Sequence, residues 1–76
     1  MQSIKQKDFN SVELTGTTKA APDTEGLFRH AKNQVPYMWI ALEGRIYVPR
    51  NGAGPNNIDV RSAQASEPFR LVLFFN

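Results

Sequence analysis

Cysteine is absent from the 76-residue sequence, and histidine occurs once, as His30. Without cysteine the chain can form no disulfide, no thiolate metal site and no cysteine nucleophile. A closed zinc site would need three carboxylates beside His30, so no metal site is predicted. Small secreted domains usually depend on disulfides because their cores are small. The composition therefore favours the cytoplasm or a virion, or a fold that is completed by oligomerisation.

Long hydrophobic segments are also lacking. Residues 1–8 are polar and hold no apolar segment of the kind found in signal peptides, so we expect no secretory signal. The longest apolar run near the C-terminus, residues 71–75, has five residues, whereas a membrane-spanning helix needs about 20. We therefore expect neither secretion through a signal peptide nor association with a membrane.

Motifs of catalysis and of phosphate binding are missing too. His30 has no nearby nucleophile, and the serines lack the Gly-x-Ser-x-Gly pattern of a nucleophile elbow. The seven acidic residues are scattered, without a pair at diagnostic spacing. Residues 50–55 contain Gly52-x-Gly54 but not the Lys and Ser/Thr of a phosphate-binding loop. We expect a protein that is not an enzyme and that binds no cofactor.

The chain does have the composition of one small globular domain, with 41% hydrophobic residues, 21% charged residues and a net charge of +2. For a chain of this length, area scaling gives a folded surface of about 4,700 Å² and burial of about 60% of the unfolded surface. We expect a flexible N-terminal arm over residues 1–8 and a single β-rich domain over residues 9–76. A core of this size is marginal and would gain from a partner.

Alternating and continuous apolar patterns predict a mainly β fold of about five short antiparallel strands, arranged as a small barrel or a sandwich. The predicted strands cover residues 9–15, 35–42, 45–48, 58–61 and 69–75. Residues 24–33 are interpreted as one short helix, with Leu27, Phe28 and Ala31 facing inward. A strand or loop through residues 27–29 is the alternative, since Gly26 would weaken the first turn of a helix.

Residues Glu43 and Gly44 separate two β-prone segments, which indicates a two-residue hairpin loop. In that register Ile40 faces Tyr47 and Trp39 faces Val48. Both faces of the hairpin are then apolar, whereas a small antiparallel sheet usually keeps one face in water. The hairpin would therefore need a closed barrel, a covering helix or another subunit.

The core is small, and the predicted hairpin has more apolar surface than the domain can cover. Our first functional hypothesis is therefore a non-enzymatic module for protein–protein interaction or assembly that acts as an oligomer. Small structural or inhibitory proteins of viruses and phages are often compact and free of cysteine, so we expect that type of protein. The expected partner is a second copy of the chain or a larger assembly. The expected contact residues are Tyr37, Trp39, Tyr47 and Phe74.

The alternative hypothesis is a small β-barrel that binds single-stranded nucleic acid. Such proteins stack bases on exposed aromatic rings beside a basic groove, and arginines are interleaved with aromatic residues in this sequence. The residues that would stack bases are Tyr37, Trp39 and Tyr47, and those that would contact phosphates are Arg45, Arg50 and Arg70. Binding to nucleic acid should weaken steeply with salt, whereas apolar association should persist in excluded salts such as sulfate.

Overall fold

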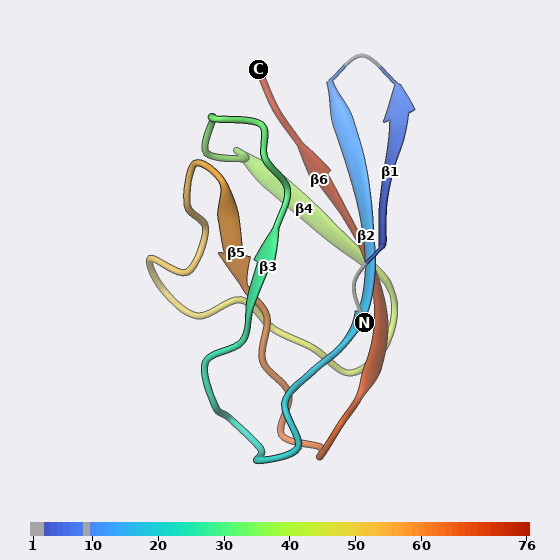
Figure 1. Cartoon of the computed structure of the whole chain (residues 1–76), viewed down its shortest axis with the longest axis vertical. Coiled ribbons are helices and arrows are strands. Elements are labelled where there is room, and N and C mark those ends of the chain that lie inside the picture. The colour runs from blue at the N-terminus through green and yellow to red at the C-terminus, as the bar shows by residue number, and fades with distance from the viewer. Residues whose placement is uncertain (1–2, 9) are drawn as a thin grey trace.

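The computed structural model describes residues 3–8 and 10–76, which form six strands (Figure 1). The strands are β1 (Ser3–Asp8), β2 (Ser11–Thr17), β3 (Leu27–Arg29), β4 (Met38–Glu43), β5 (Asn57–Asp59) and β6 (Pro68–Phe74). This part of the chain contains no helix, so it includes none that is long and apolar enough to cross a membrane.

The strands form two antiparallel sheets. One has four strands in the order β1-β2-β6-β4, and the other pairs β3 with β5. Figure 1 shows the small sheet lying to one side of the long twisted strands β2 and β6. The mainly β, antiparallel, single-domain fold is therefore confirmed, in the form of a small two-layer structure. The accessible surface is 4655 Å², in agreement with the expected value of about 4,700 Å².

The core lies between the two sheets and is centred on the pairing of β2 with β6. Val12 is opposite Leu73 and Leu14 is opposite Leu71, so these four side chains share one face of the sheet. All four are buried, because the small sheet covers that face. The other members of the core cluster are Ile58, Val60, Phe69 and Phe75. The apolar patterns that predicted strands at residues 9–15 and 69–75 thus correspond to buried side chains of β2 and β6, while Phe9 lies outside the described residues.

The N-terminal segment pairs with the sheet along its described length, where we expected a flexible arm over residues 1–8. β1 runs antiparallel to β2, from the pair Ser3 and Thr15 to the pair Asp8 and Ser11. Met1 and Gln2 lie outside the described residues. A strand of this kind is held by backbone hydrogen bonds, which need no apolar alternation in the sequence. Composition alone therefore gave no sign of it.

The short helix expected at residues 24–33 is wrong, and the alternative strand through residues 27–29 is present as β3. Asp23, Ala31 and Asn33 all have positive φ angles near +55°, which a right-handed helix does not permit. Phe28 packs its ring edge-to-face against Phe69, with the centroids 5.0 Å apart. Packing against the core therefore decides the conformation of a segment whose own propensities were ambiguous.

The hairpin expected between residues 35–42 and 45–48 is also wrong. β4 pairs with β6, with Trp39 opposite Leu73 and Ile40 opposite Val72. Residues 45–48 form no strand, and Tyr47 instead makes an isolated bridge with Arg61. The chain leaves the four-stranded sheet at Gly44 and crosses to the other layer. A local pattern could not reveal that β6, a long buried strand, is a better neighbour for β4 than the segment that follows it.

Candidate interaction surface

The segment Tyr37–Leu42, which we call the β4 edge, exposes a run of large apolar side chains. Its large apolar side chains are 37–59% exposed, and all residues of β4 are exposed. These side chains are Tyr37, Met38, Trp39, Ile40 and Leu42. A continuous apolar segment of this kind is uncommon on the surface of a monomer and usually marks an interaction site.

The exposure follows from the order of the strands. β4 has one strand neighbour, β6, and lies at the end of the four-stranded sheet away from β2 and β1 (Figure 1). Trp39 and Ala41 lie opposite the core residues Leu73 and Leu71, while Met38 and Ile40 share the other face of the sheet. Because the strand is at an edge, both of its faces remain partly open to solvent.

The backbone groups of β4 can be sorted into those that face β6 and those that face outward. Phe75 donates its N–H to the carbonyl of Asn10 at 2.8 Å. In an antiparallel ladder the hydrogen-bonded pairs alternate, so the odd-numbered residues of β6 bond to β2 and the even-numbered ones bond to β4. The partners of Phe74 and Val72 are Met38 and Ile40. The N–H and C=O groups of the intervening residues, Trp39 and Ala41, therefore point away from the sheet.

This outward ladder is short. At one end, Tyr37 donates its N–H to the Phe74 carbonyl at 3.0 Å, so that donor is already used. At the other end, the register shifts between Ala41 and Glu43, and such a bulge interrupts regular pairing. The regular open edge is thus limited to residues 38–41.

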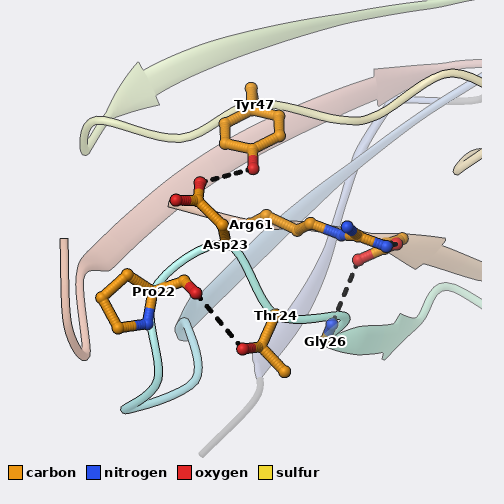
Figure 2. Close-up of polar contacts among 7 residues, drawn as sticks. Pro22, Asp23, Thr24, Gly26, Tyr47 and Arg61 are labelled. Atoms are coloured by element: carbon orange, nitrogen blue, oxygen red, sulfur yellow. Dashed lines mark hydrogen bonds and ion pairs between the residues drawn. The ribbon is translucent and has the colours of Figure 1, made fainter. Parts of the chain in front are cut away.

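The structure brings together only some of the contact residues expected from the sequence. Tyr37 and Trp39 lie on the β4 edge, and Phe74 lies beside it as the register partner of Met38. Tyr47 lies elsewhere, where its hydroxyl donates to Asp23 Oδ1 at 2.6 Å (Figure 2). Met38, Ile40 and Leu42 lie on the same exposed segment and were not among the expected contact residues. Their apolar character was plain in the sequence, but their exposure depends on the strand order.

The arginines expected to contact phosphates lie on two different segments of the chain. Arg70 forms ion pairs with Glu13 at 3.4 Å and with Glu43 at 3.5 Å. Arg45 and Arg50 are exposed and belong to the segment that leaves the sheet after Gly44. Because residues 45–48 form no strand, no hairpin register brings Arg50 opposite Tyr37. Binding of nucleic acid stays a prediction.

A cluster of polar side chains next to Tyr47 joins three segments of the chain, which contain Asp23, Tyr47 and Arg61 (Figure 2). Asp59 is buried, and its carboxylate accepts the Gly26 N–H at 3.1 Å and two Arg61 guanidinium bonds at 2.9 and 3.0 Å. The hydrogen bond to Asp23 is the main cause of a raised pKa for Tyr47. Since these groups are already engaged with one another, the cluster acts as a structural tie.

His30 is buried against Phe75 and uses both ring nitrogens. Nε2 donates to the Gly54 carbonyl at 2.9 Å, and Nδ1 accepts the Lys32 N–H at 3.3 Å. This arrangement requires the neutral ring. Burial, assisted by the nearby charges of Arg29 and Lys32, lowers the pKa of His30 below 6.5. The ring thereby holds the loop at Gly54 against the end of β3.

We expect the stability of the protein to fall between about pH 7.5 and pH 5. The unfolded chain binds a proton near pH 6.5, whereas the folded chain resists protonation because its pKa is lower. The contribution of neutral His30 is therefore complete above pH 6.5 and is lost as the pH falls through the folded pKa. Urea unfolding at both pH values measures this loss. Because His30 is the only histidine, His30→Gln should have a flat profile in this range, and an unchanged slope would contradict the assignment.

Among residues 3–8 and 10–76, no three His, Asp or Glu side chains are grouped so that they could hold a metal ion. The depression on the face of the sheet near Arg70 is open and lined by Thr15, Thr17, Glu43 and Pro68.

Comparison with protein-family models, with curated proteins and with solved structures found no match.

Proposed function

We propose that this protein is a non-enzymatic association module that joins copies of itself through the β4 edge. The observation that carries the proposal is an edge strand whose apolar side chains are exposed on both faces, next to outward backbone groups at Trp39 and Ala41. An open strand of this kind is a template for pairing with another strand. Addition of a strand satisfies the backbone, while the apolar side chains supply hydrophobic burial.

A second copy of the chain is the partner that this surface fits best. The β4 edge contains no charged residue, and the nearest charge along the strand is that of Glu43, which follows Leu42. The surface therefore lacks the charged pattern that would select a different, oppositely charged protein. Apolar side chains of the same kind can cover one another in a symmetric contact, because both copies offer the same patch. Self-association would also enlarge the small core.

The test is the mass of the protein as a function of concentration, by sedimentation over about 10–500 µM, a range suited to a small interface. We expect a concentration-dependent dimer that persists in sodium sulfate. Ile40→Lys should weaken it at least about 100-fold, because two copies each lose about 1.5 kcal/mol or more of apolar burial and 1.4 kcal/mol is tenfold.

Leu27→Lys is the matched control, since Leu27 is 58% exposed but lies on β3. This variant should associate like the original chain, and circular dichroism should show that both variants are folded. A clean monomer at all concentrations, or equal losses in the two variants, would rule out self-association through the β4 edge.

A further inference from the structure

We infer that two copies pair β4 with β4 in antiparallel orientation about a two-fold axis at Ile40. This inference rests on the proposed self-association and specifies its geometry. In this register Ile40 lies opposite Ile40 of the second copy, and Trp39 lies opposite Ala41 of the second copy. The result is one continuous sheet of eight strands, built from the two four-stranded sheets.

The outward backbone groups select this register. Only residues that point their N–H and C=O away from β6 can bond to a second copy, and on the regular part of the edge these are Trp39 and Ala41. Pairing Trp39 with Ala41 in both directions uses all four of these donors and acceptors. An axis at Trp39 would instead place Ala41 opposite Tyr37, whose N–H is already bonded to Phe74.

The side chains agree with the same register. On one face the large ring of Trp39 would lie over the small Ala41 of the second copy, so each copy supplies both the large and the small member of a pair. On the other face the two Ile40 side chains meet at the axis, where cross-strand neighbours of a non-hydrogen-bonded pair are closest. Glu43 of one copy lies away from Glu43 of the other, so like charges are not brought together.

The available area suits a dimer of modest affinity. With the five large side chains 37–59% exposed, and an aromatic side chain offering about 150–250 Å² when fully buried, each copy can bury roughly 450 Å². The pair then buries about 1,000 Å² when the backbone is included, which is the lower limit of a specific interface. A second copy of the chain can therefore bury enough of the β4 edge to form a specific dimer.

Single-cysteine variants test the register directly, because the chain has no cysteine of its own. Opposed residues of a non-hydrogen-bonded pair have Cα atoms about 4.5 Å apart, within the range of about 4.4–6.8 Å that a disulfide bridges. Ile40→Cys should therefore form a disulfide-linked dimer in a glutathione redox buffer. The product is measured by mass spectrometry and by a non-reducing gel.

Met38→Cys is the matched control. Met38 lies on the same face of β4 as Ile40 and is similarly exposed, at 43% against 47%. The two copies of residue 38 would be four positions apart, about 13 Å along the strand. We expect at least about tenfold less cross-linked product from this variant than from Ile40→Cys, and no preference between the two variants in urea.

The outcomes separate the geometry from the function on which it rests. Preferential cross-linking of Ile40→Cys supports the two-fold axis at that residue. If sedimentation shows a dimer but Met38→Cys cross-links as well or better, or neither variant does, the register is wrong while self-association stands. If both variants and the original chain stay monomeric, the proposed function fails and the inference fails with it.

Discussion

Replacing Phe69 by alanine is expected to lower the free energy of unfolding by about 3–5 kcal/mol. Phe69 is almost completely buried, at 2% exposure. Its ring fills the space between the two sheets and packs edge-to-face with Phe28. A domain of this length has a total stability of only about 4–11 kcal/mol. The change would therefore remove a large share of it, as a shift of the urea midpoint would show.

Leu27→Ala provides the comparison for Phe69→Ala, since Leu27 is 58% exposed and most surface substitutions change stability by less than about 0.5 kcal/mol. The prediction concerns packing between layers, so Phe28→Ala should reproduce part of the loss. A small effect of Phe69→Ala, with an unchanged denaturant slope, would mean that the two sheets do not depend on this ring.

The second large effect is expected for Gly44→Ala, at about 2–4 kcal/mol. Gly44 has a φ of +94°, a conformation that side chains rarely adopt. A Cβ atom there would lie 2.5 Å from the Pro68 carbonyl oxygen and 2.9 Å from Phe69 Cβ. Neither neighbour can move easily, because both belong to β6. Thermal or urea unfolding measures the loss.

Gly54→Ala is the matched control for Gly44→Ala. Its φ is not positive, and the nearest heavy atom to an added Cβ, the Asn57 carbonyl oxygen, is 3.1 Å away. We expect this variant to lose much less stability. Equal losses of unfolding free energy in the two variants would contradict the prediction. They would show that replacing any glycine destabilises the protein, whether or not it has the positive φ and close contacts of Gly44.

The strands that contribute the buried core side chains could be predicted from the sequence. The runs at residues 9–15 and 69–75 correspond to β2 and β6, because burial on one or both faces leaves a clear apolar pattern. β1 had no such pattern, since it is an edge strand held by its backbone. The spacing of apolar residues around Phe28 favoured a helix over the alternative strand, and the strand that forms instead is packed against Phe69, which is remote in sequence.

The candidate surface could be predicted only in part. Two apolar faces around Trp39 led us to expect a covering layer or subunit, and the structure leaves the large apolar side chains of the β4 edge 37–59% exposed. Which residues are left uncovered depends on whether β4 pairs with residues 45–48 or with β6, and that choice depends on contacts remote in sequence. For this reason Tyr47 was among the residues expected on the interaction surface, and Ile40 was not.

The two outer strands of the four-stranded sheet differ in a way that bears on how far assembly can proceed. β4 is apolar, whereas β1 has the sequence Ser-Ile-Lys-Gln-Lys-Asp, in which three of six residues are charged. Lysines on an outer strand discourage strand addition. Pairing of β4 with β4 uses up the apolar edge of both copies and leaves a lysine-bearing β1 at each end of the joined sheet. The proposed assembly would then be closed at two copies, because neither end of the joined sheet would offer a second apolar edge for growth into fibres.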